Sequence, residues 1–156
     1  MNTGQITPIA AVVSSIGGGV VGLALGAGLM FGSSGLALPP MLFGLCRPGF
    51  LIGWLLESLI DSTVTDVPLM FFVGPALQWG FTGFALYGAV AARSLRLLGC
   101  IFLIGVVYIL FMLASIYGES QFGHIVGGGL GVGFYFGAGL TVYWYPDRLR
   151  HLFGKG

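Results

Sequence analysis

The sequence predicts a small all-α integral membrane protein with four transmembrane helices and one further segment that is re-entrant or interfacial. Three observations predict this class. Of the 156 residues, 56% are hydrophobic and only 7% are charged, whereas a soluble domain carries about 25% charged residues. Long apolar stretches recur along the chain, and glycines recur four residues apart in the first and the last of them. We expect one membrane domain over residues 1–156, because a chain this short cannot hide so much apolar surface from water.

Four stretches are apolar over the length that a membrane span requires, about 20 residues. Gly32 and Pro39 follow the first stretch, Arg93 ends the second, and Pro146 follows the fourth. The fourth also ends in aromatic residues, which favour the headgroup level of a bilayer. The predicted spans cover residues 9–31, 67–92, 97–117 and 122–144.

The stretch between the first and second spans is harder to assign. Residues 41–60 are apolar on average but contain Arg47, Pro48 and Glu57, and the uninterrupted part is too short to cross a bilayer. We therefore predict a re-entrant or interfacial segment near residues 48–62. The alternative is a fifth transmembrane helix, which would place Arg47 and Glu57 within the bilayer at a cost of roughly a few kcal/mol each.

Basic residues set the expected orientation. Arg93 and Arg96 lie between the second and third spans, and three further basic residues follow the fourth. Since Lys and Arg gather on the cytoplasmic side of a membrane, we expect the C-terminus in the cytoplasm. The N-terminal residues lack the basic run of a signal peptide, so we expect the first span to be retained and the protein to lie in a bacterial inner membrane.

Two glycine ladders bracket the chain, one in the first span and one in the last. Glycines four residues apart share one helix face, and in lipid such a face lets another helix approach closely. We interpret both ladders as helix-packing faces, directed at another helix of the chain or at a partner subunit. The ladders consist of Gly18, Gly22 and Gly26, and of Gly129, Gly133 and Gly137.

Three polar residues are candidates for an ion or polar site. Glu57 and Asp61 lie one helical turn apart and would share a face. That face is interpreted either as a cation or proton site at an outer mouth or as the solvated side of an interfacial segment. Gln78 lies inside the second span, where its amide either bonds to another helix or contacts a substrate.

His124 is the one candidate for cofactor binding. It lies at the outer end of the last span, just before a triple glycine, and an imidazole there is a candidate axial ligand of haem or chlorophyll. A second ligand is not evident, because His151 follows the span at its opposite end. The alternative is an ordinary interfacial histidine.

No catalytic or metal-binding pattern accompanies these residues. The sequence contains no HExxH, P-loop or paired-cysteine spacing, which the corresponding chemistries require. A net charge of +1 without a basic run argues against nucleic acid as a partner. We therefore expect no enzymatic activity, no cofactor and no metal.

The function that these patterns favour is that of a non-catalytic membrane subunit. It would pack through its glycine-rich helix faces into a homo-oligomer or a larger membrane complex, with lipid and other membrane subunits or itself as partners. One alternative is a small transporter or channel with an acidic outer mouth. A second alternative is a pigment- or haem-binding membrane protein.

Overall fold

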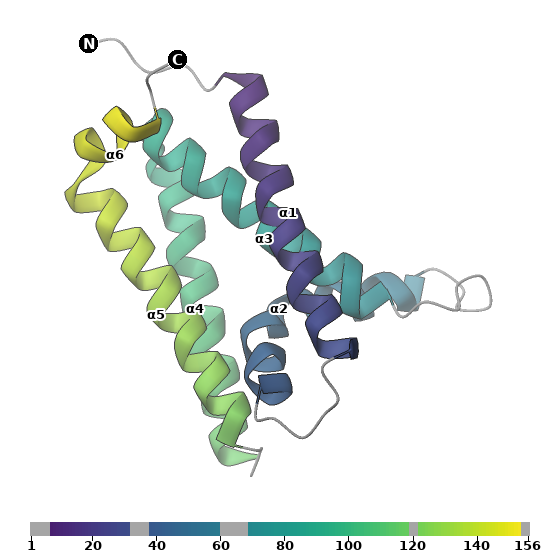
Figure 1. Ribbon diagram of the computed structural model, residues 1–156. Coiled ribbons are helices and arrows are strands. Elements are labelled where there is room, and N and C mark those ends of the chain that lie inside the picture. The colour runs from purple at the N-terminus through teal and green to yellow at the C-terminus, as the bar shows by residue number, and fades with distance from the viewer. Residues whose placement is uncertain (1–6, 32–37, 60–68, 119–121, 154–156) are drawn as a thin grey trace.

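The described part of the chain is helical throughout. The structure, a computed structural model, describes residues 7–31, 38–59, 69–118 and 122–153, and these ranges contain six helices and no strand. The predicted all-α fold is confirmed (Figure 1). The helices are α1 (Pro8–Phe31), α2 (Leu38–Leu59), α3 (Leu69–Ala91), α4 (Leu95–Tyr117), α5 (Phe122–Trp144) and α6 (Pro146–Phe153).

The boundaries of the helices follow local rules. Pro8 and Pro146 begin α1 and α6, at the position where the missing N–H of proline removes no helical bond. The Ser94 side chain caps α4 and accepts a hydrogen bond from the Leu97 N–H at 3.3 Å, as N-cap serines do. Just before this cap, Arg93 adopts a φ of 49°, and this left-handed backbone ends α3.

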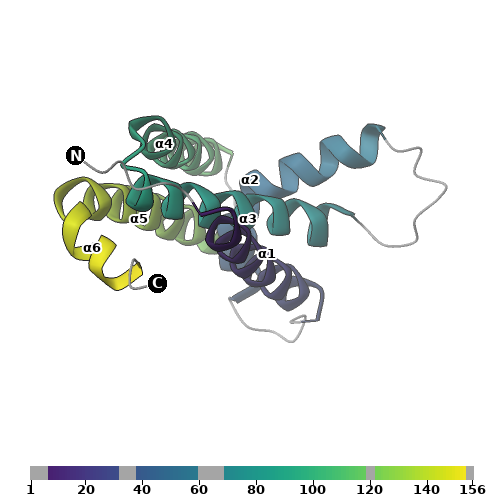
Figure 2. The same ribbon diagram turned by 90° about the horizontal axis from the view of Figure 1, so that it is seen from above.

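Helix α3 lies at the centre of the arrangement. It packs along α1, crosses α2 and also contacts α4 and α5. Helices α4 and α5 form a second antiparallel pair, and α2 joins this pair through α5. Seen from above, the C-terminal end of α2 and the N-terminal end of α3 project away from α4 and α5 (Figure 2). Helices α1 and α5, which carry the two glycine ladders, are not among the helix pairs in extensive contact.

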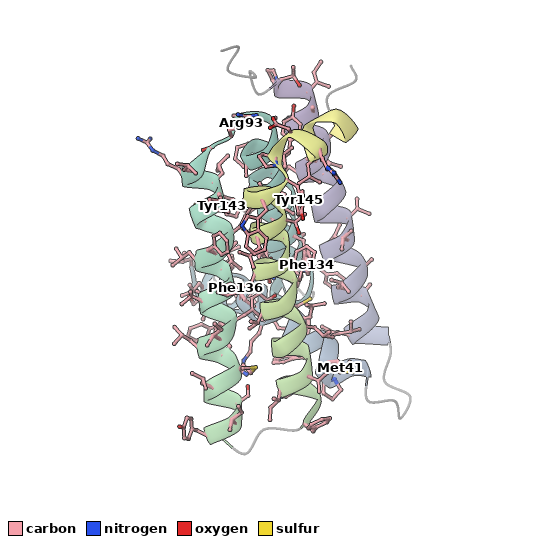
Figure 3. All side chains as sticks on the ribbon, turned by 90° about the vertical axis from the view of Figure 1, so that its left-hand side faces the viewer. Met41, Arg93, Phe134, Phe136, Tyr143 and Tyr145 are labelled. Carbon is pink, nitrogen blue, oxygen red and sulfur yellow. The ribbon has the colours of Figure 1, made fainter. Side chains whose placement is uncertain are left out.

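The start of α1 and the end of α5 lie at the same end of the bundle (Figure 1). Thr7, just before α1, hydrogen-bonds to Tyr87 near the end of α3 at 3.0 Å, and Arg93 forms an ion pair with Asp147 at the start of α6. Met41, near the start of α2, lies at the opposite end (Figure 3). Helices α2 and α3 together therefore carry the chain across the bundle once.

Four helices within the described ranges are long and apolar enough to span a membrane. The number agrees with the prediction, and the protein is an integral membrane protein. Helix α2, which was not predicted as a span, is one of the four. Helix α3, which covers most of the span predicted over residues 67–92, is 23 residues long and mostly apolar. The four stretches are Pro8–Leu29, Pro40–Leu59, Leu95–Tyr117 and Phe122–Trp144.

The segment predicted to be re-entrant or interfacial, near residues 48–62, is helical up to Leu59. It forms the second half of α2, which continues through Pro48. Residues 60–62 lie outside the described ranges. A proline inside a membrane helix is tolerated where neighbouring helices bind the backbone groups that it frees, and the contacts around Pro48 have this character.

Candidate functional site

The first glycine ladder lies against α3. A methyl group added at Gly22 would stand 2.6 Å from the backbone carbonyl carbon of Pro75, and one added at Gly18 would stand 2.7 Å from that of Trp79. Gly26 makes the same kind of approach to Phe71. The absence of side chains at these three positions therefore lets α1 and α3 meet backbone to backbone, as in other close membrane helix pairs.

The second ladder faces away from the bundle. A methyl group added at Gly133 or Gly137 would meet no atom within 4 Å, and one added at Gly129 would meet only the sulfur of Met112, at 3.9 Å. Other glycines of α5 provide its inner contacts instead, among them Gly127 against α2 and Gly131 against Tyr108. Gly133 and Gly137 are thus an open, small-residue face on the side of α5 opposite its packed face.

A buried group of polar side chains occupies the junction of α2, α3, α4 and α5. We call it the polar core. Tyr108 and Tyr135 are both 0% exposed and stack with their ring centroids 5.3 Å apart, while Gln78 and Thr82 are almost as deeply buried. The polar core consists of the side chains of Gln78, Thr82, Tyr108 and Tyr135 with the backbone groups of Leu45 and Gly49.

The carboxamide of Gln78 is the centre of the polar core. Its oxygen accepts a hydrogen bond from the Gly49 N–H at 2.7 Å, and its nitrogen donates to the Tyr108 hydroxyl at 2.6 Å. The same nitrogen lies 3.5 Å from the Leu45 carbonyl oxygen, which also accepts the hydrogen bond donated by Tyr108. The two backbone groups of α2 that flank Pro48 are thereby both bound by side chains of α3 and α4.

The hydroxyl groups of the polar core donate in a defined order. The Thr82 hydroxyl donates to the backbone carbonyl oxygen of Gln78 at 2.8 Å, and a threonine has one hydroxyl proton. Tyr135 must therefore be the donor in its 2.7 Å bond to Thr82. Every hydroxyl proton of the polar core is committed to a bond within the protein, which suits helix packing.

One buried polar atom in the described ranges has no hydrogen-bond partner, the indole nitrogen of Trp79. The Trp79 ring packs against Phe134 and Tyr135 of α5, with ring centroids 5.4 Å and 6.3 Å away. The indole therefore contributes apolar contact between α3 and α5 and takes no part in the polar core.

Arg47 ties α2 to the last turns of α4. Its guanidinium donates to the Ser115 hydroxyl and to the Phe111 carbonyl oxygen, the latter at 3.4 Å, and lies 5.3 Å from the centroid of the Phe111 ring. The C-terminal end of a helix carries partial negative charge, and an aromatic face attracts a cation. Arg47 thus finds favourable partners inside the bundle.

The remaining predicted site residues lie on different helices where the structure describes them. Glu57 lies in the last turn of α2, and Asp61 lies outside the described ranges. His124 lies in the first turn of α5, with its ring 5.2 Å from that of Phe43, and the side chain of His151 is not described. Within the described residues, no group of three or more His, Cys, Asp or Glu side chains could hold a metal ion.

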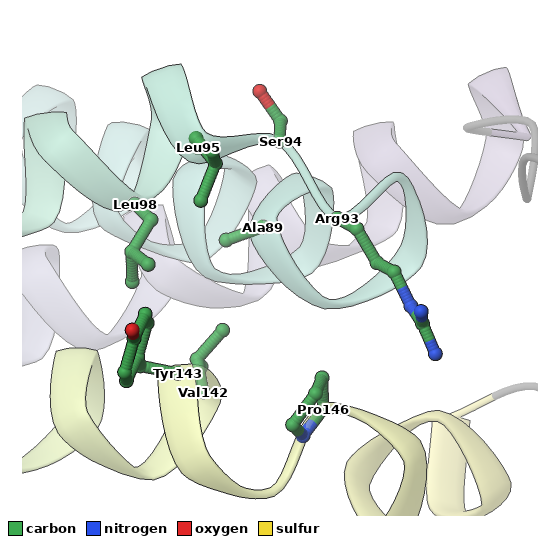
Figure 4. Close-up of a pocket in the computed structure, with 8 residues that line it drawn as sticks. All are labelled: Ala89, Arg93, Ser94, Leu95, Leu98, Val142, Tyr143 and Pro146. Carbon is green, nitrogen blue, oxygen red and sulfur yellow. The ribbon is translucent and has the colours of Figure 1, made fainter.

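Two hollows open near the end of the bundle that carries α6. The smaller, about 190 Å³, lies between the α3–α4 turn and the end of α5. Figure 4 shows Leu98 facing Val142 and Tyr143 across it, while the Arg93 side chain points toward α6. The larger, about 450 Å³, lies between α1 and α5 with α3 behind it and Leu149 of α6 along its border. We call the larger one the α1–α5 groove.

Most of the polar core was not predicted from the sequence. Gln78 was a predicted site residue, whereas Tyr108, Tyr135 and Thr82 were not. A usable signal was present, because tyrosine ordinarily favours the ends of membrane helices, and these two lie in the middle of α4 and α5. A buried tyrosine hydroxyl needs a hydrogen-bond partner, so two central tyrosines predict a polar cluster between their helices.

Comparison with known proteins adds no relative. The chain matches no protein-family model, no curated protein and no solved structure at a significant level.

Proposed function

We propose that this protein is a non-catalytic membrane subunit that assembles through the open glycine face of α5 into a homo-oligomer or a larger membrane complex. The observation that carries the proposal is the space at Gly133 and Gly137, where an added methyl group would meet no atom within 4 Å. Glycines cost helix stability relative to alanine, and inside the monomer these two bring no close contact in return. A second helix pressed against this face would supply that contact.

The polar core supports the same proposal. Its donors are bound within the protein, and it joins four helices. The arrangement suits a rigid scaffold whose outer faces do the recognition.

The test compares two open glycines on different helices. Gly133→Leu fills the proposed face, and Gly99→Leu fills an equally open position on α4. Native mass spectrometry of the purified protein in mild detergent reports the assembly state. We expect the wild-type protein and Gly99→Leu to form the same assembly and Gly133→Leu to be monomeric. A monomeric wild-type protein with no co-purifying subunit, or an intact assembly of Gly133→Leu, would contradict the proposal.

We further propose a bacterial inner membrane and a cytoplasmic C-terminus. Arg93, Arg96 and Arg148 flank helix ends that meet at the same end of the bundle, and basic residues concentrate on the cytoplasmic side. The two alternatives from the sequence keep their own tests. Ion flux into proteoliposomes, with Glu57→Gln as the variant, tests the channel, and an absorption spectrum of the purified protein tests the pigment at His124.

A further inference from the structure

The α1–α5 groove has a volume of about 450 Å³. This volume falls in the range of about 300–1,000 Å³ that small-ligand sites occupy. Its walls are mostly apolar side chains and glycines from three long helices. Among them are Gly17 of α1, Leu86 and Val90 of α3, and Ala138 and Val142 of α5.

The groove lies on the side of the bundle where α1 and α5 lack extensive contact. In a membrane, the medium next to such a gap at the depth of α1 and α5 is hydrocarbon. No water-filled pathway is needed to bring an apolar chain to it. The lack of a side chain at Gly17 leaves the groove open on its α1 side, since a methyl group added there would meet no atom within 4 Å.

Helix α6, which carries positive charge, borders the groove. Leu149 lines the groove, and Arg148 and Arg150 lie on either side of it in the chain. Asp147, the one acidic residue of α6, is already in an ion pair with Arg93. The Arg148 guanidinium lies 5.8 Å from the centroid of the Tyr145 ring and makes no ion pair within the described residues. An uncompensated cation on the helix that borders an apolar groove suits a ligand with an apolar chain and an anionic head.

We propose that the α1–α5 groove binds one acyl chain of an anionic phospholipid, with the phosphate of the lipid held at the Arg148 end of α6. This site is separate from the glycine face of α5 and does not depend on the oligomer. Two features select this occupant over a helix of another copy. Helix α6 borders the groove through Leu149, and the positive charge of the neighbouring Arg148 complements a phosphate.

The test measures lipid retention with a matched pair of filled glycines. The wild-type protein, Gly17→Phe and Gly99→Phe are reconstituted in nanodiscs of equal parts phosphatidylglycerol and phosphatidylcholine, then released and analysed by native mass spectrometry. Both glycines have open space for a side chain, but only Gly17 lines the groove. We expect the wild-type protein and Gly99→Phe to retain one phosphatidylglycerol and Gly17→Phe to lose it. If Gly17→Phe does not fold, Gly17→Leu takes its place.

The headgroup contact has its own pair of variants. Arg148→Gln should lower the preference for phosphatidylglycerol over phosphatidylcholine about fivefold, the effect of one basic residue near an anionic lipid surface. Arg96→Gln, on the exposed start of α4, should leave the preference unchanged. Equal lipid retention by the wild-type protein and Gly17→Phe would overturn the proposal. So would equal retention of the two lipids, or a disulfide between copies through Ala138→Cys that shows a second chain in the groove.

Discussion

The side-chain oxygen of Gln78 accepts a hydrogen bond from the backbone N–H of Gly49 at 2.7 Å. The same carboxamide reaches the Leu45 carbonyl, which is the group four residues earlier that a regular helix pairs with that N–H. The Gln78 carboxamide therefore bridges these two backbone groups of α2, next to Pro48, as an additional peptide group would. It explains how α2 continues through a proline within a membrane-spanning length.

Removing this carboxamide should destabilise the fold. Gln78→Leu leaves the Gly49 N–H and the Tyr108 hydroxyl without their partner, and we expect the free energy of unfolding to fall by about 2 kcal/mol. Leu77→Ala, at an exposed neighbouring position on α3, is the control and should cost less. Unfolding in mixed micelles, followed by circular dichroism, measures both. Equal stability of Gln78→Leu and the wild-type protein would show that the polar core contributes no net stability.

The contact between α1 and α3 should tolerate no added side chain. A methyl group at Gly22 would overlap the Pro75 backbone, so Gly22→Ala should lower the free energy of unfolding by about 2 kcal/mol, as overpacking does. Gly17→Ala on the same helix meets open space. It should leave stability unchanged or raise it by up to about 1 kcal/mol, because alanine favours a helix. The same unfolding measurement distinguishes them, and an inverted order would contradict the α1–α3 packing.

The positive charge of Arg47 should stabilise the fold, and a negative charge at the same position should destabilise it. Arg47→Met keeps the apolar stem, and Ser115 retains its own bond to the Phe111 carbonyl at 2.9 Å. We expect it to cost about 1 kcal/mol, the size of one cation–aromatic contact. Arg47→Glu places a carboxylate against the carbonyl end of α4 and should cost about 3 kcal/mol or more. Thermal unfolding in detergent compares the two, and equal losses would argue against an electrostatic role.

The number of crossings can be tested with single cysteines. In a background of Cys46→Ala and Cys100→Ala, we expect Thr7→Cys and Arg96→Cys to react with an impermeant maleimide only after the cells are permeabilised. Phe122→Cys, at the other end of the bundle, should react in intact cells. Four crossings require Thr7 and Arg96 to behave alike. Opposite labelling of these two positions would restore the five-span alternative.

The prediction of the helices succeeded because each depends on local properties. The bounds of α1, α4 and α5 follow the apolar stretches within a few residues, since burial in lipid and backbone hydrogen bonding within a helix need no distant partner. The region near Arg47 and Pro48 was harder to predict. These residues interrupt an apolar pattern in the sequence, and they are accommodated by Phe111, Ser115 and Gln78, from helices far away in the chain.

The glycine ladders also show a feature that the sequence predicts and an outcome that only the packing of the helices decides. The spacing of Gly22 and Gly133 predicts a smooth helix face in both cases, and nothing in the spacing separates the two. In the structure Gly22 of α1 packs against α3, whereas Gly133 of α5 faces outward. The difference arises from the rotation of each helix about its own axis, which is set when the bundle packs.

The sequence by itself determined the solvent of this protein, its helical class and the number of helices suited to a bilayer, because composition and apolar length act residue by residue. Only the tertiary structure decided that one glycine ladder is buried while the other is open. It also decided that Gln78 supports α2 and that a groove bordered by the positively charged α6 lies between α1 and α5. These features depend on contacts between residues far apart in the chain, such as Gly49 and Gln78, which are 29 positions apart, and such contacts exist only once the helices have packed.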